Sequence, residues 1–110
     1  MIRIEAWEEQ DGTLKRLTVR GHAGAGRYGE DVVCSAVSAL VETLALGFSR
    51  TQGRCVVEEG RAEFELPEDA SFELQVGFDW IGAGLKDLAL SHGQFVRWQA
   101  IKTPARDEEV

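Results

Sequence analysis

The chain has 110 residues, of which 44% are apolar, and a formal net charge of −7. This length and composition suit one domain with a single hydrophobic core. The acidic balance disfavours a nucleic-acid surface, because phosphate binding needs clustered Lys and Arg, and it favours a basic partner. The sequence lacks both an apolar run of about 18 residues and an apolar signal-peptide centre, so we expect a cytoplasmic protein without membrane contact.

Five segments alternate apolar and polar residues with the period of a β-strand. In chain order these predicted strands are residues 2–8, 14–21, 54–59, 61–66 and 95–101. Turn signals at Asp11-Gly12 and at Gly60 join the first two strands and the next two strands as hairpins. Tight hairpins make each of these pairs antiparallel.

Two longer segments have the period of an α-helix. The first runs from Asp31 to about Thr51, and its apolar stripe consists of Val33, Val37, Leu40, Leu44 and Phe48. The second covers residues 70–92, with a stripe made of Leu74, Gly77, Phe78, Ile81, Gly84, Leu85 and Leu88. Each glycine costs a helix roughly 1 kcal/mol relative to Ala, so we expect those on the stripe to permit close approach of a neighbour.

The order of elements is therefore ββαββαβ. It predicts an α/β fold of the α+β type, a two-layer sandwich in which two helices cover one face of a mostly antiparallel five-stranded sheet. Residues 1–101 form this single domain, and residues 102–110 are expected to be a flexible tail.

The glycine-rich segment GAGRYG, residues 24–29, matches the dinucleotide fingerprint G-x-G-x-x-G between a strand and a helix. Two features disfavour nucleotide binding. Glu30 and Asp31 place carboxylates where the helix N-terminus would meet a pyrophosphate. The preceding strand closes a hairpin, whereas the fingerprint belongs to a βαβ unit.

A second interpretation concerns Cys34 at the start of the first helix. If Asp31 is the N-cap, Cys34 is the third helical residue, where free backbone N–H groups and the helix dipole favour the thiolate. The helical period places Cys34 about 75° from the centre of the apolar stripe, with Ser38 beside it on the same flank. The thiol is therefore expected to open onto a groove.

His22 is the candidate partner of this thiol. It directly follows the second predicted strand, and the intervening loop contains Gly24, Gly26 and Gly29. Such a loop can fold back and bring the imidazole to the thiol, where it would act as a base. Free cysteines are also commonly small buried residues, and a histidine at a strand end often bonds a carbonyl. Residue types and spacing leave both interpretations open.

Two blocks of the sequence, GHA and YGEDVVCSAVSAL, resemble the signature of the ribosomal-processing cysteine protease family Prp. In that family a Gly-His-Ala turn precedes Gly-x-Asp-[Ile/Val]-Val-Cys-x-Ala-Val-Ser. The matching residues are Gly21, His22, Ala23, Gly29, Asp31, Val33, Cys34, Ala36, Val37 and Ser38. Residues 50–110 resemble the family in pattern alone.

The resemblance implies a homodimeric cysteine endopeptidase with no metal or organic cofactor. Its substrate would be the precursor of a bacterial large-subunit ribosomal protein, number twenty-seven, from which it removes an N-terminal extension. Cys34 would be the nucleophile and His22 the general base and then acid, beside an apolar groove for an aromatic substrate residue. Asp31 would either orient His22 or cap the helix. Ser38 would bond within the site or keep the flank small.

The glycines of this segment, Gly21, Gly24, Gly26 and Gly29, suggest a mobile loop that closes His22 over bound peptide. A competing interpretation is a non-catalytic dimeric module that binds a ribosomal protein or an assembly intermediate.

Four residues outside the signature have structural interpretations. Cys55 lies on a predicted strand and is expected to point into the hydrophobic core. His92 is expected to end the second helix. Trp7 and Trp98 are expected on the sheet face away from the helices, where exposed aromatic surface would suit dimerisation or docking.

Overall fold

The computed structural model describes residues 1–21, 30–51 and 53–103. The order of elements is β1 (Ile2–Glu8), β2 (Leu14–Arg20), α1 (Glu30–Ser49), β3 (Arg54–Glu58), β4 (Arg61–Glu65), α2 (Phe72–Ser91) and β5 (Val96–Lys102). This is the predicted order ββαββαβ. The last strand extends to Lys102, one residue beyond the predicted domain end, and residues 104–110 of the predicted tail lie outside the described residues.

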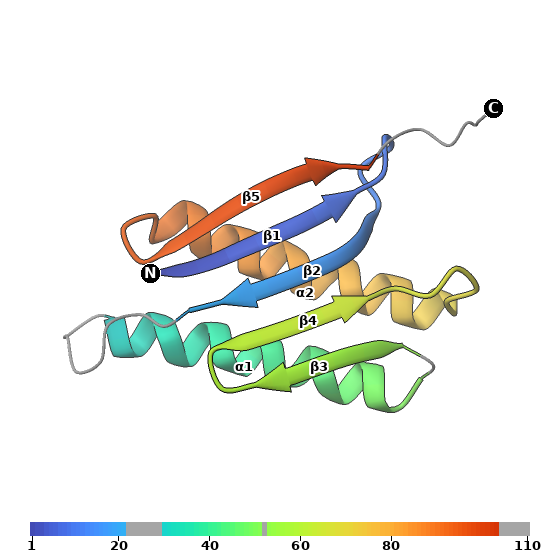
Figure 1. Cartoon of the computed structure of the whole chain (residues 1–110), viewed down its shortest axis with the longest axis horizontal. Coiled ribbons are helices and arrows are strands. Elements are labelled where there is room, and N and C mark those ends of the chain that lie inside the picture. Colours follow the sequence, from blue (N-terminus) through green and yellow to red (C-terminus); the bar gives the residue numbers. More distant parts are fainter. Residues whose placement is uncertain (22–29, 52, 104–110) are drawn as a thin grey trace.

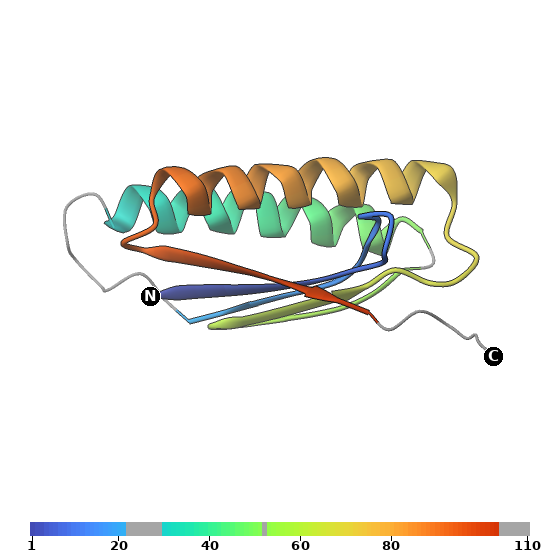
Figure 2. The same cartoon turned by 90° about the horizontal axis from the view of Figure 1, so that it is seen from above.

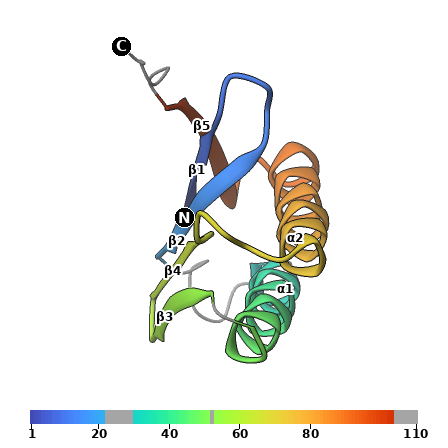
Figure 3. The ribbon, with the colours of Figure 1, turned by 90° about the vertical axis from the view of Figure 1, so that its right-hand side faces the viewer.

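The five strands form one sheet in the order β3-β4-β2-β1-β5. Three neighbouring pairs are antiparallel, and β1 pairs with β5 in parallel. Both helices lie on one face of this sheet, with α1 against β3 and α2 against β5 and β2 (Figures 1, 2 and 3). The predicted two-layer, mostly antiparallel architecture is confirmed.

The alternation in the strands directs one set of side chains into a core between the sheet and the helices. The strand residues of this core, each at most 7% exposed, are Ile2, Ile4, Ala6, Leu14, Leu17, Val19, Ala62, Phe64 and Val96. The glycine turns form as predicted, with φ of +91° at Gly12 and +76° at Gly60. In the first turn, Thr13 donates its backbone N–H to Asp11 Oδ1 at 2.9 Å.

Helix α1 buries a stripe slightly rotated from the predicted one. Val33, Val37, Leu44 and Phe48 are buried as expected, but Val41 is buried in place of Leu40. Leu40 is half-buried because it faces the second helix, where its Cδ1 lies 3.3 Å from the position that a Cβ on Gly84 would take. By length and hydropathy the segment Val32–Ser49 could cross a membrane, a test that core helices also pass. Here its apolar stripe packs into the core.

Helix α2 forms as predicted, but it begins two residues later and ends one residue earlier than the predicted range 70–92. Ser71 is its N-cap and accepts a hydrogen bond from the Leu74 N–H at 3.1 Å, and His92 is its C-cap. Two glycines permit close packing: Gly84 against Leu40, and Gly82 against Leu14. Gly77 does not, because a Cβ added there meets nothing within 4 Å. The predicted packing role of Gly77 is therefore wrong.

We expect Gly77→Ala to stabilise the protein by about 0.5–1 kcal/mol, because Ala restricts the unfolded chain and adds no contact that must move. Urea denaturation followed by circular dichroism measures this change. The matched substitution Gly82→Ala is the control. Its Cβ would lie 2.7 Å from Leu14 Cδ2, so it should gain less or lose stability. Equal effects at both positions would contradict this account of the glycines.

Two further positions differ from prediction. Trp98 pairs in register with Ile4, which places it on the helix side of the sheet, and its Nε1 is buried without a partner among the described residues. The prediction that Trp98 faces away from the helices is wrong. Trp7 does lie on the outer face, where the guanidinium carbon of Arg16 sits 4.8 Å from its ring centre. Cys55 is only half-buried, because β3 is an edge strand.

Candidate active site

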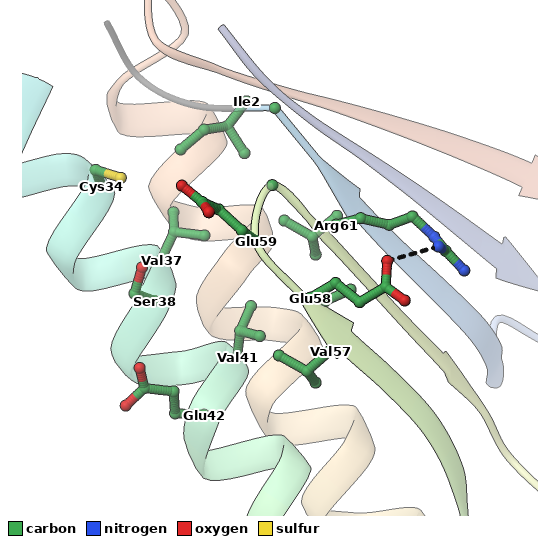
Figure 4. Close-up of a pocket in the computed structure, with 14 residues that line it drawn as sticks. Ile2, Cys34, Val37, Ser38, Val41, Glu42, Val57, Glu58, Glu59 and Arg61 are labelled. Atoms are coloured by element: carbon green, nitrogen blue, oxygen red, sulfur yellow. Dashed lines mark hydrogen bonds and ion pairs between the residues drawn. The ribbon is translucent and has the colours of Figure 1, made fainter. Parts of the chain in front are cut away.

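A groove opens between helix α1 and the β3–β4 hairpin, at the end of the sheet where the hairpin turns (Figure 4). Apolar side chains from both layers line it: Ile2, Val19, Val37, Val41, Val57 and Ala62. Its polar and small lining residues are Gly21, Cys34, Ser38, Glu42, Glu58, Glu59, Gly60 and Arg61. The groove has a volume of about 280 Å³. It can therefore accept an apolar side chain with a stretch of extended backbone.

Cys34 lies at one end of this groove. It is half-buried on the flank of α1, as its position on the helical wheel predicts, and its sulfur points from the helix towards the groove (Figure 4). Ser38 is exposed one turn further along the same flank and lines the same groove. Residues four apart on a helix are neighbours, so the structure brings these two predicted site residues together.

The other predicted site residues are only partly described. His22, Gly24, Gly26 and Gly29 lie outside the described residues, and so does the side chain of Asp31. Within the described ranges, no group of three or more His, Cys, Asp or Glu side chains could hold a metal ion.

The start of α1 corrects one prediction. The helix begins at Glu30, so Asp31 is its second residue and is not the N-cap. Cys34 is then the fifth helical residue, beyond the four N–H groups that lack partners within the helix. Helical side chains lean towards the N-terminus, so the thiol still lies near the first turn.

Gly21 forms the corner where the β2 strand leaves the sheet beside the groove. Its φ is +93°, and a Cβ there would lie 2.5 Å from the Met1 carbonyl oxygen. Its N–H donates to the carbonyl of Gly60 at 2.9 Å, which ties this corner to the hairpin turn. The residue is therefore glycine because of steric contact and backbone conformation, in addition to any role in the loop that follows.

Four charged side chains line the groove, and three of them are acidic. Arg61 pairs with Glu58, with 3.0 Å between Nη1 and Oε1, and also with Glu63 outside the groove, with 3.0 Å between Nε and Oε2. The hydrogen bond with Glu63 raises the pKa of Arg61 and lowers the pKa of that carboxyl group. Glu42 and Glu59 have no ion pair or hydrogen bond with any described residue.

The second wall of this groove, formed by the β3–β4 hairpin, was not predicted. Val57 lies on the same strand face as Cys55, two residues further along β3, but it is 48% exposed and lines the groove. The signal that could have indicated this is the position of Val57 just before an acidic turn in a short strand. The local sequence pattern does not show which strand lies at the edge of the sheet.

Comparison with known proteins identifies the class of enzyme. The family model described as "Cysteine protease Prp" matches residues 1–97, so the chain belongs to this family and is a cysteine protease. No curated protein matches the chain.

Solved structures share the fold of this chain. The fold is similar to that of SMU.848 from Streptococcus mutans, with a TM-score of 0.80 and 26% identity over 94% of this chain and 96% of that chain. It is also similar to the essential ribosomal processing protease Prp from S. aureus in complex with a covalently linked product peptide. That match has a TM-score of 0.78 and 18% identity over 92% of this chain and 100% of that chain. The S. aureus protease with a substrate peptide matches with the same TM-score, 17% identity and the same coverage.

Proposed function

We propose that this chain is an endopeptidase that removes the N-terminal extension of the large-subunit ribosomal protein number twenty-seven, with Cys34 as nucleophile and His22 as general base and acid. The observation that carries the proposal is the position of Cys34 at the end of an apolar groove in a chain of the Prp family. A thiol at that position can attack a peptide bond whose neighbouring side chain occupies the groove.

The chemistry proceeds in two halves. His22 takes the proton of the Cys34 thiol, and the thiolate attacks the carbonyl carbon of the scissile bond. The tetrahedral intermediate then expels the amine, to which His22 gives its proton, leaving a thioester on Cys34. Water, deprotonated by His22, attacks the thioester and releases the acid with the free thiol. Free N–H groups at the first turn of α1 are the candidate oxyanion donors.

The position of Gly21 supports the role of His22. Gly21 lines the groove together with Cys34, and His22 is the next residue in the chain. The chain therefore attaches His22 directly to a residue of the groove. Because Asp31 is not the helix cap, its proposed role is to orient His22. Ser38 is proposed to donate a hydrogen bond within the site.

The proposal includes a homodimer in the cytoplasm. Helix α2 exposes an apolar stripe that supports self-association: Phe72 is 79% exposed, and Trp80 and Leu90 are each 76% exposed. These three residues fall within about a quarter of the helix circumference. Large exposed apolar side chains gathered on one face are typical of an interaction surface.

Incubation with the extended ribosomal precursor tests the proposed function. Intact-protein mass spectrometry should show loss of the N-terminal extension at a single bond. The precursor without its extension is the control and should remain unchanged. A precursor that binds the protein but keeps its full mass would contradict the protease assignment for this substrate. It would favour a non-catalytic binding module.

A further inference from the structure

We propose that the groove beside Cys34 selects a substrate with a Lys or Arg side chain close to the scissile bond, and that Glu59 is the residue that recognises it. This inference rests on the proposed function, because it concerns the substrate of that same groove.

Glu59 is placed to meet a bound peptide. It occupies the turn between β3 and β4, and its side chain extends from that turn across the groove towards Cys34 (Figure 4). The carboxylate is exposed and has no ion pair or hydrogen bond with a described residue. A peptide that lies in this groove and is attacked by Cys34 would therefore pass this side chain.

The neighbouring acid, Glu58, is bound differently. Its Oε1 lies 3.0 Å from Arg61 Nη1, so its charge is already compensated within the protein. Arg61 is the cation among the described lining residues, and it is held by both Glu58 and Glu63. Arg61 is therefore already paired within the protein, whereas the carboxylate of Glu59 is available to bind a ligand.

The remaining charges of the groove have the same sign. Glu42 lines it two turns along α1 from Cys34 and has no ion partner among the described residues. Both free carboxylates therefore repel an acidic peptide and attract a basic one, in a protein whose formal net charge is −7. The apolar floor takes an apolar side chain, so the substrate class is an extended peptide that combines apolar and basic residues.

A panel of peptides that share one apolar residue at the scissile bond tests this inference. On each side of that residue, the two nearest positions carry Lys, Gln or Glu in turn. The value of kcat/KM for each peptide is measured with the parent protein, with Glu59→Gln and Glu59→Lys, and with the matched control Glu58→Gln. For the parent we expect Lys over Glu at one position by about fivefold at low salt, as for an exposed ion pair. The preference should shrink as salt rises.

The variants separate recognition from general charge effects. Glu59→Gln should bring the preference close to one, Glu59→Lys should reverse it, and Glu58→Gln should retain it. A preference that survives Glu59→Lys, or that Glu58→Gln removes equally, would overturn the inference. If the parent protein cuts all peptides without a charge preference, this inference is wrong but the proposed function still stands. If no peptide is cut and the precursor also stays intact, the proposed function fails.

Discussion

Cys34→Ala is expected to lower kcat/KM for the extended precursor by at least about a thousandfold, because the alanine has no group that can form the thioester. Cys34 is the thiol that lines the groove, and its half-buried position means that truncation removes little packing. The variant should therefore keep the fold of the parent protein and still bind the precursor. Initial rates of product formation by mass spectrometry measure the loss, and circular dichroism checks the fold.

Cys55→Ser is the matched control for this experiment. Cys55 is also a half-buried free cysteine, but it lies on edge strand β3 and does not line the groove. Its replacement should leave kcat/KM within about twofold of the parent value, since it removes no group that touches substrate. Cleavage by Cys34→Ala at the parent rate would exclude it as the nucleophile. Loss of activity in Cys55→Ser with an intact fold would show that Cys55, and not Cys34, is the thiol that catalysis needs.

The strand faces were predictable because they depend on a local period. Ile2, Ile4 and Ala6 alternate with polar residues, and their burial to 2% or less follows directly from that alternation. The pairing of β1 with β5 was not predictable in the same way. It depends on which edge of the sheet β5 joins after the α2 crossover. The local sequence pattern of the two strands does not indicate that edge. The face of Trp98 was predictable, because it follows Val96 by two residues and Val96 is buried in the core.

The candidate site was predictable on its helical side. The period of α1 placed Cys34 and Ser38 on one flank, and both line the groove. The opposite wall comes from the β3–β4 hairpin, which is brought there by the tertiary order of strands. Glu59 looked like an ordinary turn residue, because its importance arises from the helix across from it. The helix start was misjudged by two residues, because Cys34 was expected as the third helical residue and is the fifth.

Phe48→Ala is expected to destabilise the protein by about 3–5 kcal/mol. Phe48 is 1% exposed and links three elements, because its ring centre lies 5.3 Å from that of Phe64 in β4 and 5.4 Å from that of Phe78 in α2. Both contacts are edge-to-face, at 67° and 71°. Alanine would forfeit the buried ring and both aromatic contacts, and the rigid sheet on one side limits collapse of the cavity.

This loss is a large share of the roughly 5–15 kcal/mol that a domain of this size possesses, so the variant should be close to its unfolding threshold at physiological temperature. Urea denaturation measures it through the midpoint and slope of the transition. Leu46→Ala on the same helix is the control, since Leu46 is 61% exposed and its truncation should cost less than about 0.5 kcal/mol. A loss below about 1 kcal/mol for Phe48→Ala would show that the three rings do not hold α1 on the sheet. The position of Cys34 would then need another explanation, because the same helix carries both residues.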